Sequence, residues 1–63
     1  ERAVPVLAQA LERGDEAVRA YAAWALGNIG GRTAAAHLKA AGDREGNAQV
    51  REEIGLAREA ARR

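Results

Sequence analysis

Apolar residues recur along the chain at the three- and four-residue spacing that is typical of amphipathic helices. This spacing divides the sequence into four segments, and we expect helices over residues 3–12, 16–28, 33–41 and 48–62. Pro5 is the single proline, and it falls in the first turn of the first segment, where a helix leaves that N–H group unbonded anyway. The pattern therefore predicts an all-α chain.

The turns between the segments carry residues that begin and end helices. Asp15 and Asn47 stand directly before the second and fourth segments, where a side-chain oxygen can accept a hydrogen bond from a free backbone N–H group. Gly30-Gly31 supplies the left-handed conformation that ends a helix without steric cost. Residues 42–46 include two glycines, and we expect a flexible turn there. Consecutive helices should then pack as antiparallel pairs.

One face of each segment is expected to contribute to a shared core. In the second segment a stripe of apolar residues runs at helical spacing: Val18, Ala22, Ala25 and Ile29, with Leu26 beside it. The expected core combines this stripe with apolar positions of the other segments: Leu7, Leu11, Val18, Ala22, Ala25, Leu26, Ile29, Leu38, Val50, Ile54 and Ala57. A chain of this size buries only about 60% of its unfolded surface, so the core is small.

The second and fourth segments repeat each other. Val18-Arg19 recurs as Val50-Arg51 thirty-two residues later, and the two caps, Asp15 and Asn47, keep the same offset. Leu7 of the first segment corresponds to Leu38 of the third at an offset of thirty-one residues. A period of this length, made of two helices, is typical of solenoid proteins. We therefore divide the chain into repeats over residues 1–31 and 32–63.

The residue types limit the chemistry that this chain can perform. It has no cysteine and one histidine, His37, so we expect no metal site, no cofactor and no catalytic residue. Glu52 and Glu53 are adjacent, and their side chains should diverge by about 100° on a helix rather than meet at one substrate. The glycines at the end of the second segment end a helix instead of opening one, which argues against a phosphate-binding loop.

Charge and hydropathy constrain partners and location. The net charge is +1, although residues 32–63 carry seven basic and five acidic side chains, a weak bias toward an anionic partner. No apolar run approaches the about 20 residues of a membrane span, and no leader pattern precedes Glu1. We expect a cytoplasmic protein without membrane contact, and a chain that looks like a fragment of a larger one.

Residues 15–30 read DEAVRAYAAWALGNIG, and this run resembles the HEAT-like repeat of the phycobilisome-lyase type, D-x-x-V-R-x-x-A-A-x-A-L-G-x-I-G. The resemblance implies an α-α superhelix of two antiparallel helix pairs, used as a non-catalytic scaffold or interaction surface. The second repeat departs from this pattern, since Arg58 and Glu59 stand where Leu-Gly is expected. We interpret it as a C-terminal cap. The uncapped N-terminal side should then pack on an upstream domain or on a second copy, as a homodimer.

A narrower stretch, V-R-x-Y-A-A-W-A-L-G-x-I-G-G followed by V-R-E-E-I, is similar to the C-terminal HEAT-like module of bacterial epoxyqueuosine reductases. Those enzymes act on tRNA with cobalamin and iron–sulfur clusters held by Cys-rich domains. None of that chemistry can reside in a chain without cysteine. This resemblance implies an accessory module that positions tRNA within an oxidoreductase.

Three groups of residues are candidates for function. The first is structural, capping helices and bridging the repeats: Asp15, Arg19, Asn47 and Arg51. The resemblance implies that the second group lies on the concave surface, from which it would contact a partner: Tyr21, Trp24, Ala20, Glu52 and Glu53. The third consists of basic residues at turns and ends that could reach phosphates: Arg44, Arg62 and Arg63. Two interpretations of Trp24 stay open, because it could also pack on a neighbouring repeat or on an upstream domain.

The sequence therefore leaves two hypotheses of different classes. In the first, the chain is a protein-interaction module whose surface around Tyr21 and Trp24 meets another protein. In the second, it is a tRNA-positioning appendage. The acidic pair Glu52 and Glu53 on the inner face favours the first, and the basic C-terminal residues favour the second.

Overall fold

A computed structural model of the chain describes residues 3–62. It contains four helices: α1 (Ala3–Arg13), α2 (Glu16–Ile29), α3 (Gly31–Arg44) and α4 (Ala48–Ala61). The described residues form no strand, which confirms the predicted all-α class. The helix α3 is longer at both ends than the pattern predicted. The prediction of a flexible turn over residues 42–46 is wrong for residues 42–44, which belong to α3. Gly42 is half-buried beside Ile54, so packing holds the helix intact through a residue of low helix propensity.

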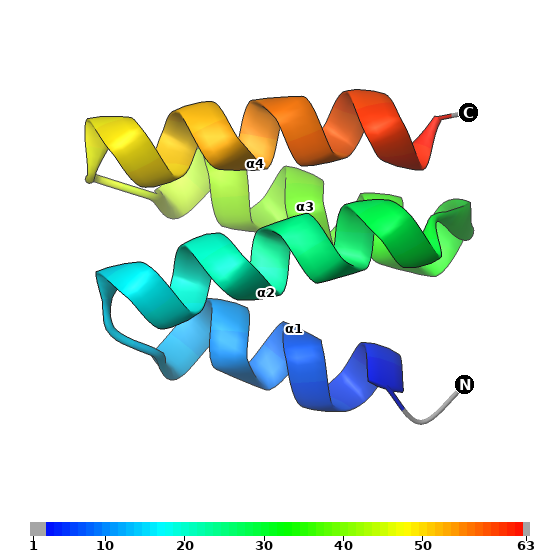
Figure 1. Cartoon of the computed structure of the whole chain (residues 1–63), viewed down its shortest axis with the longest axis horizontal. Coiled ribbons are helices and arrows are strands. Elements are labelled where there is room, and N and C mark those ends of the chain that lie inside the picture. The colour runs from blue at the N-terminus through cyan, green and yellow to red at the C-terminus, as the bar shows by residue number, and fades with distance from the viewer. Residues whose placement is uncertain (1–2, 63) are drawn as a thin grey trace.

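The four helices form two layers (Figure 1). Consecutive helices run antiparallel. The helices α2 and α4 lie side by side in the front layer, and α1 and α3 lie behind them. The contact between α2 and α4 is the most extensive in the molecule, and the contact between α1 and α3 is the least extensive of those between packed helices. The two helix pairs are therefore joined mainly through the front layer.

Local hydrogen bonds explain where the helices begin. The Val18 N–H donates to Asp15 Oδ1 at 2.9 Å, and the Val50 N–H donates to Asn47 Oδ1 at the same distance. Gly30, with φ of 72°, and Gly31, with φ of 87°, both occupy the left-handed region that favours glycine. They reverse the chain between α2 and α3 within a single residue.

Most of the predicted core is buried. Seven predicted residues are buried: Leu11, Ala22, Leu26, Leu38, Val50, Ile54 and Ala57. Leu7 and Ala25 are half-buried, and buried positions that the prediction omitted are Val4, Ala23, Ala34 and Ala41. The prediction is wrong for Val18 and Ile29, which are 42% and 41% exposed.

The two errors share one cause. Val18 and Ile29 occupy the positions of Val50 and Ala61 at the thirty-two-residue offset. In α4 this stripe packs against the core, where Val50 is buried and Ala61 is half-buried. No helix pair precedes α2 among the described residues to cover its stripe as α2 covers that of α4, so the ends of the α2 stripe remain exposed. The sequence pattern grouped these residues correctly, but it could not show whether a neighbouring helix covers them.

A glycine sets how closely the two helix pairs approach. A Cβ atom placed on Gly27 of α2 would lie 2.9 Å from both the Cα and the carbonyl oxygen of Ala57 on α4. Backbone atoms cannot yield as a flexible side-chain end can, so no larger residue fits without moving a helix. Gly27 and Ala57 together permit close contact of α2 and α4.

Candidate interaction surface

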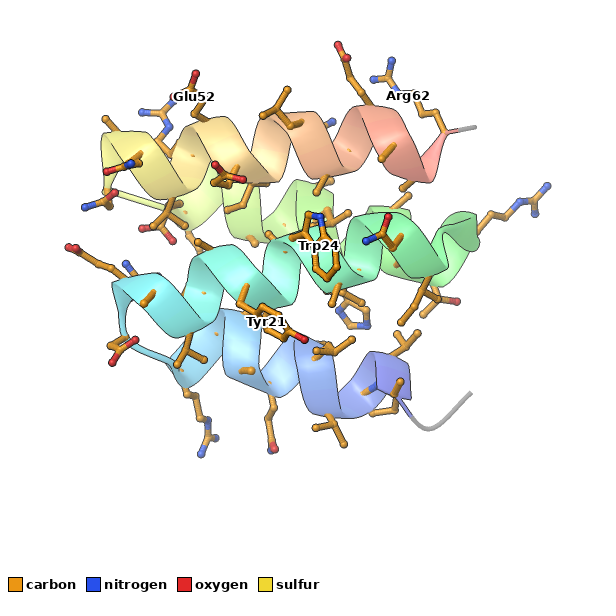
Figure 2. The ribbon with its side chains drawn as sticks, in the orientation of Figure 1. Tyr21, Trp24, Glu52 and Arg62 are labelled. Carbon is orange, nitrogen blue, oxygen red and sulfur yellow. The ribbon has the colours of Figure 1, made fainter. Side chains whose placement is uncertain are left out.

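Large apolar side chains are exposed on the front of α2. The rings of Tyr21 and Trp24 have centroids 5.8 Å apart and planes tilted by 37°. Tyr21 is 64% exposed and Trp24 is 57% exposed, and Figure 2 shows both side chains on the same side of the molecule. Aromatic side chains present large, rigid contact area, and they dominate the binding energy of many protein interfaces.

The equivalent position of the second helix pair is also apolar and exposed. Leu56 stands at the position of Trp24 in the repeat and is 60% exposed. Leu56 was not among the residues predicted to contact a partner. We call the surface formed by Tyr21 and Trp24 the aromatic face.

A groove of about 300 Å³ runs between the N-terminal halves of α2 and α4. We call it the acidic groove, and its lining residues are Glu16, Ala17, Ala20, Asn47, Gln49, Val50 and Glu53. Two carboxylates and no basic side chain line it. The fold thus brings together Ala20 and Glu53, two predicted contact residues from different helices. Glu52, a third, is exposed at the other edge of α4 and does not join them (Figure 2).

An ion pair connects the two helix pairs behind this groove. Arg19 Nε lies 2.8 Å from Glu45 Oε1, and Arg19 Nη2 donates to Glu45 Oε2 at 2.8 Å. Arg19 Nη1 also donates to the Gly14 carbonyl oxygen at 3.0 Å, and the Asn47 N–H donates to Glu45 Oε2 at 3.1 Å. A bidentate ion pair of this kind fixes the relative orientation of the two side chains as well as pairing their charges.

The pair was only partly foreseen from the sequence. Arg19 was expected to bridge the repeats, but its partner Glu45 was placed in a flexible turn. The hydrogen bonds from Arg19 lower the pKa of the Glu45 carboxyl, and the same pair raises the pKa of Arg19. Arg51 occupies the position of Arg19 in the second pair, yet it is exposed and has no ion-pair partner among the described residues.

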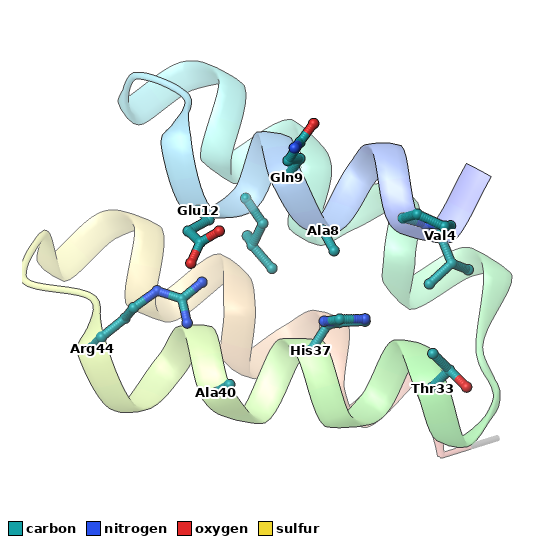
Figure 3. A pocket seen from close by; sticks show the side chains of 10 residues that line it. Val4, Ala8, Gln9, Glu12, Thr33, His37, Ala40 and Arg44 are labelled. Carbon is teal, nitrogen blue, oxygen red and sulfur yellow. The ribbon is translucent and has the colours of Figure 1, made fainter. Parts of the chain in front are cut away.

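The two predicted phosphate contacts that lie within residues 3–62 line different grooves. Arg44 lines an outer groove of about 520 Å³ between α1 and α3, facing Glu12 across it (Figure 3). Arg62 lies at the end of α4 (Figure 2), where it lines a different groove, between α3 and α4. Arg63 lies outside the described residues. That second groove also contains three cations that were not selected as candidates: Arg32, Lys39 and Arg58.

The polar side chains of the outer groove come from α1 and α3. His37 and Thr33 line the outer groove from α3, and the remaining polar groups there are Gln9, Glu12 and Arg44 (Figure 3). Within residues 3–62, no group of three or more His, Cys, Asp or Glu side chains is placed to hold a metal ion. What the described surface offers is contact area and charge.

No helix of the described chain has the length and apolar character needed to cross a bilayer.

Comparison with known proteins identifies one match. A family model described as HEAT repeats matches residues 1–58, which is most of the chain. The curated proteins contain no match to this sequence, and neither do the solved structures.

Proposed function

Because the chain belongs to the HEAT-repeat family, we propose that its front layer is a non-catalytic surface for binding another protein. HEAT repeats commonly mediate protein interactions, and solenoid repeats build extended surfaces of this kind. The observation that carries the proposal is the exposed pair of Tyr21 and Trp24. Monomeric proteins rarely expose contiguous apolar patches unless a partner covers them.

The surroundings of the aromatic face indicate the chemistry of the partner. Glu16 and Glu53 line the acidic groove beside it without a basic side chain among the lining residues. A partner segment with an apolar side chain for the aromatic face and a Lys or Arg for the groove would satisfy both parts. We propose that this segment inserts its basic group between α2 and α4.

Selection from a displayed library of random peptides tests this proposal. We expect the selected peptides to contain an apolar residue near Lys or Arg, and to bind Trp24→Ser at least about tenfold more weakly than the parent. Val6→Ser on α1 is the matched control, because Val6 is also a large exposed apolar residue, at 68%. Peptides that bind Trp24→Ser and the parent equally well would contradict the proposal.

The finer alternative is a tRNA-positioning module similar to that of epoxyqueuosine reductases. It is supported by the resemblance over residues 18–31 and by the basic residues that line the groove between α3 and α4. Titration with unmodified tRNA at two salt concentrations separates the alternatives. Salt-sensitive binding that is lost in Arg62→Glu and kept in Trp24→Ser would favour tRNA. Binding of selected peptides without binding of tRNA would favour the protein partner.

The exposed end of the α2 stripe supports a third contact. Val18 and Ile29 are about two-fifths exposed. We propose that an upstream domain or a second copy covers this edge. Sedimentation over a range of protein concentrations tests the homodimer, which should dissociate in Val18→Asp. A chain that is monomeric at every concentration leaves only the upstream domain as occupant.

A further inference from the structure

Four cations and two alanines line the groove between α3 and α4. We call it the basic groove, of about 310 Å³, and its lining residues are Arg32, Ala35, Ala36, Lys39, Arg58 and Arg62. No acidic side chain lines it. From this geometry we infer that the basic groove is a second binding site, and that it takes an acidic peptide segment that also carries apolar side chains.

The charges of the groove are nearly uncompensated within residues 3–62. Lys39 Nζ lies 3.5 Å from Asp43 Oδ2, but both side chains are about two-thirds exposed, so the pair is weak. Arg32, Arg58 and Arg62 have no ion-pair partner among the described residues. Like charges that face one groove repel each other, and an incoming carboxylate relieves that repulsion.

A further repeat could not stack on α4 in the way that α4 stacks on α2, as the matched positions of the two helices show. Arg58 and Glu59 hold the positions of Leu26 and Gly27 at the thirty-two-residue offset. Leu26 is fully buried, and Gly27 has no room for a Cβ against Ala57. A helix packed on α4 as α4 packs on α2 would therefore meet Glu59 where only glycine fits.

The floor of the groove selects the kind of anion. Ala35 and Ala36 place methyl groups between cations contributed by two helices. Guanidinium groups bind carboxylates through paired hydrogen bonds, and an alanine floor gives buried area to a Leu or Val side chain. A nucleic-acid backbone would use the charges but not the floor. Both features are used together only by a peptide with carboxylates and apolar residues.

Binding can be measured with three labelled probes: a peptide of Glu, Leu and Ala, the same peptide with Ser in place of Leu, and oligothymidylate. We expect the first peptide to bind best and to shift the NMR methyl signals of Ala35 and Ala36. Arg58→Glu should weaken its binding about tenfold or more. Arg51→Glu is the matched control, because it makes the same charge change on the same helix away from the groove.

Several outcomes would overturn the inference. Equal losses in Arg58→Glu and Arg51→Glu would mean diffuse attraction without a site. Binding of oligothymidylate as tight as that of the first peptide would make the groove a general polyanion site. Unchanged Ala35 and Ala36 signals would place the peptide elsewhere. Loss of binding in Trp24→Ser would assign the peptide to the aromatic face, whereas unchanged binding in that variant keeps the two sites distinct.

Discussion

The helices α2 and α4 carry the same cap position and the same Val-Arg pair, and they end up in different surroundings. Val50 is 2% exposed while Val18 is 42% exposed. Arg19 pairs with Glu45, whereas Arg51 has no ion-pair partner among the described residues. The helix α4 packs on α2, which belongs to the preceding helix pair, whereas no helix pair precedes α2 among the described residues.

This difference teaches that a repeat motif specifies which residues can face a neighbour, and that position in the stack decides whether they are buried. The valine of the motif contributes hydrophobic stabilisation only where a second helix removes it from water. The same residues can therefore be core in one pair and available surface in the other. Paired substitutions at matched positions test this directly.

The largest difference is expected for the two valines. Val50→Ala removes buried methyl groups and should lower the free energy of unfolding by about 2 kcal/mol. Val18→Ala acts on a side chain that is 42% exposed and should cost less than about 1 kcal/mol. Urea denaturation of both variants measures the two values. Equal costs would mean that Val18 is covered in solution, for example by a second copy.

Substitutions at two glycines should give the next largest changes in stability, with opposite signs. Gly27→Ala forces a methyl group against the Ala57 backbone and should destabilise the fold by about 1–2 kcal/mol. Gly55 of α4 has nothing within 4 Å of its Cβ position, so Gly55→Ala should stabilise by about 0.5–1 kcal/mol through helix propensity. Thermal unfolding of both variants decides the sign. A stabilised Gly27→Ala would show that α2 and α4 can separate freely.

The two arginines differ in how stability should respond to pH. The pKa of Glu45 is lower in the folded chain than in the unfolded chain, because Arg19 donates hydrogen bonds to the carboxylate. The resulting stabilisation is present above the unfolded pKa and is lost as the pH falls through the folded pKa. Arg19→Gln should flatten this acid-side loss, and Arg51→Gln should keep it. Melting temperatures measured from neutral pH into the acid range would show whether the two curves differ.

The smallest effect on stability is expected at Trp24 and Leu56, which occupy matched, exposed positions. Replacing either by Ser should change the free energy of unfolding by no more than about 0.5 kcal/mol. Peptide binding should nevertheless fall more in Trp24→Ser than in Leu56→Ser, because Trp24 also contacts the Tyr21 ring. A large loss of stability in Trp24→Ser would identify the side chain as part of the fold rather than of a binding surface.

Sequence reasoning captured what depends on neighbours along the chain. Asp15 and Asn47 cap their helices because a cap needs only the next few residues. The exposure of Val18 could not be predicted, since periodicity does not say how many helix pairs stack beside α2. The role of Glu45 was missed because its partner Arg19 lies twenty-six residues away.

The candidate sites followed the same rule. Tyr21 and Trp24 are three residues apart on one helix, so their proximity could be predicted. The acidic groove joins Glu16 to Glu53, and the basic groove joins Arg32 to Arg58. Each depends on which helices lie side by side, and that is settled by tertiary packing rather than by local pattern.

The glycine contact between α2 and α4 has a mechanical consequence. In the front layer, the backbone of Gly27 lies directly against Ala57, with no room for one more carbon atom. In the rear layer, a groove of about 520 Å³ lies between α1 and α3. A force that bends the stack toward its front layer would compress atoms that have no free space. A force that bends the stack toward its rear layer would push together the side chains that line an open groove, and these can move at little cost. The molecule is therefore stiffer against one direction of flexing than against the other.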